Sequence, residues 1–122
     1  MCTVTYIPFK ESVFITSNRD ESPKRRSKGL TSIHQPGLPA VHFPLDEDSH
    51  GSWIALTDDG RTACLLNGGL KPFIPDASYR MSRGQVVIDA ASAHNIYSFV
   101  EDYILAGVAP FTLLLYEHDV FV

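Results

Sequence analysis

A strong β-hairpin pattern lies in the middle of the chain and limits the folds that the sequence can adopt. Residues 53–57 and 62–67 are rich in strand-forming residues, and they flank the short polar segment Asp58-Asp59-Gly60-Arg61. Gly60 tolerates the positive φ angle that a tight turn needs. The two runs therefore predict neighbouring antiparallel strands.

A second hairpin is predicted at the start of the chain. Residues 2–7 and 13–18 are rich in Thr, Val, Ile, Tyr and Phe, and residues 8–12 are typical of the loop between them. Such a loop pairs residue 7 with residue 13, and therefore residue 2 with residue 18. This register brings Cys2 beside Asn18-Arg19-Asp20-Glu21.

Two segments are predicted to be irregular. Residues 19–51 contain prolines and charged clusters that break any periodicity, which predicts a long loop, and loops of that length are often functional. Gly68-Gly69, Pro72 and Pro75 end the strand at 62–67 and begin another irregular stretch.

The last third of the chain predicts two helices and a strand pair. Apolar residues recur at helical spacing in 86–91 and 96–104, with Asn95 as an N-cap and Gly107 as a stop. Residues 110–116 and 120–122 are apolar and strand-like. The order predicts an α+β fold, with helices on one face of a mainly antiparallel sheet. Because an apolar strand at the very end would expose an edge, we expect residues 1–122 to form one domain that is truncated at its C-terminus.

Composition excludes several classes of protein. A chain of 122 residues that is 44% hydrophobic can build one core. A net charge of −4 argues against nucleic-acid partners. Neither a signal peptide nor an apolar run of about 20 residues is present in the sequence, so we expect a cytoplasmic protein without a membrane span. Assembly into a homo-oligomer is compatible with this composition.

Cys2 is the candidate nucleophile. Removal of Met1 would leave a free α-amine on the residue that carries the thiol. The reference pKa values are about 7.7–8.0 for the amine and about 8.5 for the thiol, so proton exchange between them is easy near neutral pH. Arg19 could stabilise the thiolate, Asp20 could hold the amine while pairing with Arg19, and Asn67 could donate to an oxyanion.

Simpler interpretations stay open. An Arg-Asp pair after a strand is typical of a surface ion pair, and Asn-Gly-Gly is typical of a turn. The acidic run at 46–48 and the basic run at 24–26 are interpreted as solvated charges, and Cys64 as a small core residue. We predict no metal and no cofactor, because metal-ligand spacing is absent from the scattered histidines His34, His42, His50 and His94.

Several motifs together resemble the NRDE family, which is named for its Asn-Arg-Asp-Glu motif and includes transport and Golgi organisation protein 2. The matching segments are Met1-Cys2-Thr3-Val4, Thr16-Ser17-Asn18-Arg19-Asp20-Glu21-Ser22-Pro23, residues 53–57, Leu66-Asn67-Gly68-Gly69 and Ser82-Arg83-Gly84. The resemblance implies an αββα sandwich related to N-terminal-nucleophile hydrolases, with antiparallel sheets and helices packed outside. This chain would be about the first half of a typical member.

The resemblance also implies chemistry. By similarity, Cys2 is the nucleophile of an amidohydrolase that cleaves linear C–N bonds in small non-peptide amides, supported by Arg19 and Asp20. Those hydrolases space the Arg and Asp differently from the adjacent pair here. We assign to catalysis the residues Cys2, Arg19, Asp20 and Asn67. We assign to substrate binding the residues Asn18, Glu21 and Trp53. The alternatives are a binding, carrier or trafficking protein, for which the family resemblance suggests Golgi organisation or haem handling, and a purely structural domain.

Overall fold

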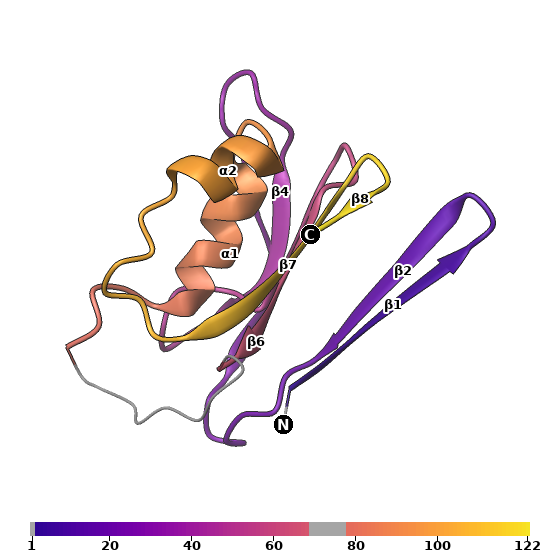
Figure 1. Cartoon of the computed structure of the whole chain (residues 1–122). Coiled ribbons are helices and arrows are strands. Elements are labelled where there is room, and N and C mark those ends of the chain that lie inside the picture. The colour runs from indigo at the N-terminus through magenta and orange to yellow at the C-terminus, as the bar shows by residue number, and fades with distance from the viewer. Residues whose placement is uncertain (1, 69–77) are drawn as a thin grey trace.

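The computed structural model describes residues 2–68 and 78–122. Its main body is a six-stranded antiparallel sheet in which strands follow one another in chain order, with the helices inserted between β6 and β7 (Figure 1). Met1 and the predicted irregular residues Gly69, Pro72 and Pro75 lie outside the described residues. The strands of this sheet are β3 (Ser27–Ile33), β4 (Val41–Asp46), β5 (Ile54–Thr57), β6 (Thr62–Asn67), β7 (Phe111–Glu117) and β8 (Val120–Phe121).

The central hairpin prediction is confirmed. β5 and β6 pair through Ile54–Cys64 and Leu56–Thr62, and Gly60 in the turn has a φ of 89°. β6 lies between α1 on one face and the N-terminal hairpin on the other, so its first four residues, 62–65, are buried. Cys64 is accordingly 0% exposed, which confirms its assignment to the core. Burial raises the pKa of the Cys64 thiol and keeps it protonated.

The long loop predicted for residues 19–51 is wrong, because this segment contains β3 and β4. Two features explain why the sequence pattern did not predict these strands. The register between β3 and β4 shifts around Gly29, which interrupts the alternation of side chains. Pro44 lies in β4 beyond the registered β4–β5 pairs, Val41–Thr57 and His42–Leu56, so its missing N–H costs no bond to β5.

Both predicted helices are present, α1 (Arg83–Ser92) and α2 (Ile96–Asp102). Asn95 caps α2 as predicted, because its side chain accepts a hydrogen bond from the Ser98 amide at 2.8 Å. α2 ends at Asp102 rather than near Gly107, since Tyr103 turns to an extended conformation and its hydroxyl donates to Asp89 on α1 at 2.5 Å. Ile104, which belongs to the predicted helical repeat of apolar residues, lies beyond the end of α2 and is 70% exposed.

The hydrophobic core lies between α1 and the sheet. Alternate residues of β4, β5, β6 and β7 face the apolar side of α1, and α2 adds Ile96 and Phe99. Burying each large apolar side chain contributes about 1.5–3 kcal/mol, so this layer carries most of the hydrophobic stabilisation. The fully or nearly fully buried members include Val41, Phe43, Ala55, Ala63, Leu65, Val86, Val87, Ala90, Ala91, Ile96 and Leu115.

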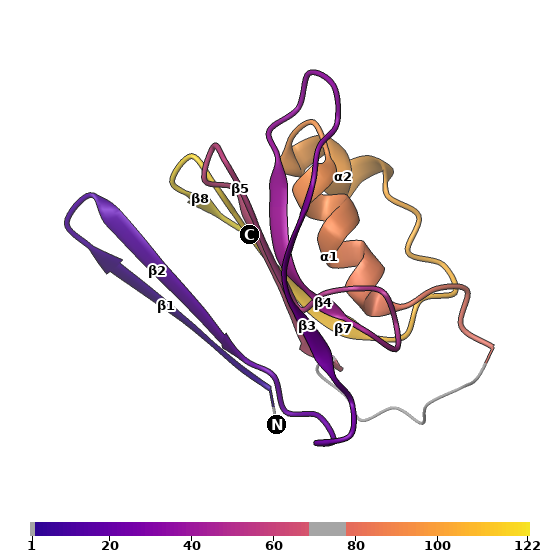
Figure 2. The same cartoon turned by 180° about the vertical axis from the view of Figure 1, so that it is seen from behind.

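The N-terminal hairpin consists of β1 (Thr3–Phe9) and β2 (Ser12–Asn18), which form a separate two-stranded sheet. It lies over the sheet face opposite the helices (Figures 1 and 2). The predicted loop at 8–12 is wrong, because the turn is only Lys10-Glu11, with Lys10 at a φ of 55°. The pairing is therefore Thr3 with Asn18, and by extension Cys2 with Arg19.

This one-residue difference in register decides which way Cys2 points. Residues directly opposite in an antiparallel pair share a face, so Cys2 and Arg19 lie on the face that carries Val4, Ile15 and Ser17. These residues are half-buried against the large sheet, whereas Phe14 and its neighbours on the other face are exposed. The hairpin thus turns Cys2 inward.

A buried ion pair joins the helices to the sheet. Arg61, which is 4% exposed, donates through Nε to Glu117 at 2.5 Å and through its Nη atoms to carbonyl groups of Ala91, Ala93 and His94 at the end of α1. The other oxygen of Glu117 accepts from the Ile96 amide at the start of α2, at 3.2 Å. A cation at a helix C-terminus also complements the helix dipole.

We predict that Glu117→Gln lowers the free energy of unfolding by about 3–5 kcal/mol, because it leaves the buried Arg61 charge uncompensated. Urea denaturation followed by circular dichroism measures this loss. The matched control is Glu101→Gln on the exposed side of α2, which should change stability by less than about 0.5 kcal/mol. Equal effects of the two substitutions would contradict the assigned role of the pair.

Candidate functional site

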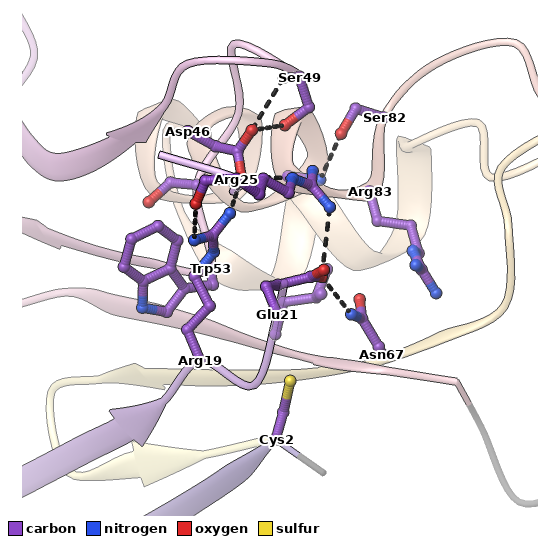
Figure 3. A pocket seen from close by; sticks show the side chains of 13 residues that line it. Cys2, Arg19, Glu21, Arg25, Asp46, Ser49, Trp53, Asn67, Ser82 and Arg83 are labelled. Carbon is purple, nitrogen blue, oxygen red and sulfur yellow. Dashed lines mark hydrogen bonds and ion pairs between the residues drawn. The ribbon is translucent and has the colours of Figure 1, made fainter. Parts of the chain in front are cut away.

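A small cavity opens where the N-terminal hairpin meets the end of β4, the start of β5, the end of β6 and the start of α1. Its volume is about 70 Å³, which suits a small functional group rather than a whole large ligand. Figure 3 shows the side chains that line it. Among the described residues they are Cys2, Arg19, Glu21, Arg25, Asp46, Ser49, Ser52, Trp53, Leu65, Asn67, Ser82, Arg83 and Gly84.

Asp46, at the end of β4, is the centre of this site. It is 3% exposed and ion-pairs with both Arg19 and Arg25, the latter through Nε at 2.9 Å. Its other oxygen accepts from the backbone amide and hydroxyl of Ser49 at 2.9 and 3.0 Å. Burial acts to raise the pKa of Asp46, but the Ser49 hydrogen bonds and the two arginines together hold it below its ordinary value.

The interpretation of residues 46–48 as a solvated acidic run is therefore wrong at Asp46, although Glu47 and Asp48 are exposed. The interpretation of residues 24–26 as a solvated basic run fails in the same way at Arg25, which is half-buried against Asp46. Asp46 and Arg25 are each the one residue of their charged run that pairs with an opposite charge distant in the sequence. Local composition contains no signal for such a partner.

Arg19 is held by three contacts. It ion-pairs with Asp46, donates through Nη1 to the Arg25 carbonyl at 3.2 Å, and stacks with its guanidinium carbon 4.8 Å from the centre of the Trp53 ring. The observed acidic partner is thus Asp46 on the large sheet. These contacts tie the end of β2, and with it Cys2, to β4 and β5.

Two ion pairs and one hydrogen bond lead from Asp46 toward Cys2. Arg25 reaches Glu21 at 3.2 Å, and Glu21 in turn accepts a hydrogen bond from Asn67 Nδ2 at 3.2 Å. The half-buried Cys2 points its sulfur toward Glu21 and Asn67 in Figure 3. The cavity therefore combines a thiol, an oriented amide donor and anchored charges.

The structure brings together five of the residues predicted from sequence, namely Cys2, Arg19, Glu21, Trp53 and Asn67. Asn18 and Asp20 are exposed and are not among the described residues that line the cavity; Asn18 pairs with Thr3 in the hairpin. Sequence reasoning missed Asp46 and Arg25 as site residues. The segment Ser82-Arg83-Gly84 also lines the cavity. It was noted in the sequence as part of the family resemblance, without a predicted role in the site.

Two glycines let α1 approach the site closely. A Cβ atom on Gly84 would lie 2.8 Å from the Ser52 backbone nitrogen, and one on Gly51 would lie 2.6 Å from the Gly84 carbonyl carbon. The Ser52 amide donates to the Gly84 carbonyl at 3.0 Å across this contact. The start of α1 is thereby pressed against the segment before β5, which brings Ser82 and Arg83 to the rim of the cavity.

In residues 2–68 and 78–122, no group of three His, Cys, Asp or Glu side chains is arranged to hold a metal ion. The helices described in this part of the chain are too short or too polar to cross a membrane. A family model described as "Transport and Golgi organisation 2" matches residues 1–120. The match confirms the resemblance noted in the sequence. No curated protein and no solved structure matches the chain.

We predict that the stabilising effect of Asp46 depends on pH. Because folding lowers its pKa, its contribution is fully present above the ordinary value of 3.8 and is lost as the pH falls through the lower folded value. Asp46→Asn should therefore be strongly destabilising at pH 7 and differ less from the wild type in acid. Urea denaturation at several pH values tests this, with exposed Asp48→Asn as the control. A constant difference across this range would be the contrary result.

We also predict that Gly84→Ala lowers the free energy of unfolding by about 1–3 kcal/mol, since the added methyl group meets backbone atoms that cannot move aside. The control is Gly29→Ala, where a Cβ atom would have no neighbour within 4 Å. Thermal unfolding of both variants measures the difference. Equal melting temperatures would show that the close contact is not needed.

Proposed function

The chain belongs to the transport and Golgi organisation 2 family, and from that premise we propose that it is an amidohydrolase whose nucleophile is Cys2 and whose substrate is a small non-peptide amide. The observation that carries the proposal is the inward-facing Cys2 sulfur in a cavity where Arg19 and Arg25 pair with the buried Asp46. We further propose an N-terminal-nucleophile-hydrolase-like αββα sandwich. The helix layer, the large sheet and the hairpin on its far face support this architecture.

The reaction requires removal of Met1. The freed α-amine takes the proton of the Cys2 thiol, and the thiolate attacks the amide carbonyl, forming a C–S bond while the π electron pair moves to oxygen. When the tetrahedral intermediate collapses, the C–N bond breaks and the leaving amine takes the proton from the α-ammonium group. Water, deprotonated by the α-amine, then attacks the thioester, releases the carboxylic acid and restores the thiol.

Asn67 is the proposed oxyanion donor. Its amide carries two N–H groups, one of which donates to Glu21 at 3.2 Å. That bond fixes the plane of the amide, because Glu21 is itself held by Arg25. The second N–H is then oriented for the oxygen that gains charge during attack, and a preorganised donor of this kind favours the transition state over the substrate.

Binding without catalysis is the second candidate function. The family description names transport and Golgi organisation rather than a reaction, which favours a carrier or trafficking role. Such a role would use the same cavity for a ligand and would not need the Cys2 thiol. The two functions therefore differ in their dependence on one sulfur atom.

We predict that protein from which Met1 has been removed hydrolyses the chromogenic amide 4-nitroacetanilide, and that Cys2→Ala lowers the rate by at least about 100-fold through loss of the nucleophile. Release of 4-nitroaniline measures the reaction, and intact-mass spectrometry detects an acetyl group on Cys2. The matched control is Cys64→Ala, which removes the buried thiol and should stay active.

Two results would contradict this function. Hydrolysis that is equally fast in Cys2→Ala would exclude Cys2 as the nucleophile, and full activity in protein that retains Met1 would exclude the α-amine as the base. Ligand retention that is unaffected by Cys2→Ala, in a protein without hydrolysis, would favour the carrier role instead.

A further inference from the structure

A second polar cluster lies on the large sheet, apart from the Cys2 cavity. The Ser32 Oγ atom lies 2.8 Å from His42 Nδ1, and His42 Nε2 lies 2.8 Å from a carboxylate oxygen of Asp58. Ser32 belongs to β3, His42 belongs to β4, and Asp58 directly follows β5. None of the three is among the described residues that line the Cys2 cavity. A hydroxyl, an imidazole and a carboxylate linked in this order can activate the hydroxyl as a nucleophile.

The register of the sheet brings Ser32 and His42 together. The Asp58 amide donates to the Ala40 carbonyl at 3.1 Å. On the same two strands His42 lies opposite Leu56, two residues further along. Because hydrogen-bonded pairs alternate in an antiparallel ladder, the His42 backbone bonds to β5, and its pairing with Ser32 on β3 is a non-hydrogen-bonded one. Side chains approach most closely at such pairs, which explains the short contact between Ser32 and His42.

The two hydrogen bonds orient the imidazole as a general base. An ionised carboxylate only accepts hydrogen bonds, so Asp58 holds a hydrogen on His42 Nε2. In a neutral imidazole the lone pair is then on Nδ1, which accepts the hydroxyl hydrogen of Ser32. Ser32 is exposed and the His42 side chain is 28% exposed, so a substrate can reach both groups.

An apolar groove adjoins the imidazole. Its volume is about 450 Å³, which is within the range of sites for small molecules. Leu30 is 75% exposed and Leu56 is 48% exposed, so the groove presents apolar surface that a ligand can cover. Its described lining contains no Asp, Glu, Lys or Arg, and this favours an uncharged, apolar ligand. The described residues that line it are Leu30, His42, Pro44, Ile54, Ala55 and Leu56.

We propose that Ser32 and His42 form a second hydrolytic site, which acts on carboxylic esters with an apolar acyl chain. The groove beside His42 holds the acyl chain, and Asp58 acts as a positioning residue through the imidazole. β3 is at the edge of the six-stranded sheet, so the Ser32 amide N–H faces away from β4 and is the donor assigned to the oxyanion. This activity does not use the Cys2 thiol and is independent of the proposed amidohydrolase function.

The proposed reaction has two steps. His42 Nδ1 takes the hydroxyl proton as Ser32 Oγ bonds to the acyl carbon and the carbonyl π electron pair moves to oxygen. When this intermediate collapses, the ester C–O bond breaks and the alcohol leaves with the proton from His42. A water molecule then gives a proton to His42 and attacks the acyl group. The bond from the acyl carbon to Ser32 Oγ breaks, the carboxylic acid is released, and His42 returns the proton to Ser32.

The test measures hydrolysis of 4-nitrophenyl octanoate by Cys2→Ala protein, which lacks the nucleophile of the proposed amidohydrolase. In this background we expect Ser32→Ala to lower kcat/KM at least about tenfold, because the acyl acceptor is lost. The matched control is Ser12→Ala, which removes an exposed serine of β2 and should keep the rate. A fluorophosphonate reagent should phosphonylate Ser32 with loss of fluoride, and peptide mapping locates the label.

Two further substitutions separate the roles of the base and of its positioning residue. His42→Gln should abolish labelling of Ser32, whereas His34→Gln, which removes an exposed imidazole outside the groove, should leave it unchanged. Asp58→Asn should lower kcat about tenfold without changing KM, because it disturbs the imidazole and not the groove. Asp58→Glu should restore part of kcat.

The groove has its own readout, the ratio of kcat/KM for 4-nitrophenyl octanoate to that for 4-nitrophenyl acetate. Leu30→Gln should lower this ratio about threefold or more, since it removes apolar surface that only the longer acyl chain covers. An unchanged ratio would overturn the assignment of the groove to the acyl chain.

Three results would overturn the hydrolytic site itself. They are equal rates in the Cys2→Ala background with and without Ser32, equal losses in His42→Gln and His34→Gln, and a wild-type protein in which Ser32 takes up no label. The last result does not depend on whether any variant folds. None of them bears on the proposed role of Cys2, which is tested by amide hydrolysis.

Discussion

The contact between Asp46 and its two arginines is the interaction on which the site depends. The β1–β2 hairpin forms its own sheet, and an isolated two-stranded hairpin is marginally stable in water. Side chains must therefore fix its position over the large sheet. Midway along β1, the centre of the Tyr6 ring lies 4.7 Å from that of Phe121, and at the Cys2 end Arg19 reaches Asp46 and Trp53. The buried Asp46 carboxylate is thus what holds Cys2 at the cavity.

The other wall of the cavity depends on how α1 is fixed at its two ends. Arg61 and Glu117 bind the C-terminal end of α1 to the sheet, and the contact between Gly51 and Gly84 presses its N-terminal end against the segment before β5. Arg83 follows directly from this placement, because it is the first residue of the helix. The same helix therefore contacts the Arg61–Glu117 ion pair at its C-terminal end and brings Arg83 to the cavity at its N-terminal end.

Local patterns in the sequence predicted the elements whose signals are local. The β5–β6 hairpin, the cap at Asn95 and the burial of Cys64 each follow from a few neighbouring residues. β3 and β4 were not predicted, because a register shift interrupts the alternation of side chains and because Pro44 is unusual within a strand. The register of the first hairpin was wrong by one residue, because its turn is shorter than predicted. Asp46 was missed for a different reason. Its partner Arg19 directly follows β2 of the other sheet, and a contact between two sheets produces no periodic pattern in the sequence.

A double-mutant cycle on Arg19 and Asp46 tests most directly whether their contact positions the nucleophile. The four proteins are the wild type, Arg19→Gln, Asp46→Asn and the double variant, each without Met1, and the measured quantity is the rate of Cys2 alkylation by iodoacetamide. If the contact positions Cys2, the second substitution adds little to the first, with a coupling above about 0.5 kcal/mol. Strictly additive effects, or rates equal to the wild type in all four proteins, would show that the Arg19–Asp46 contact does not position Cys2.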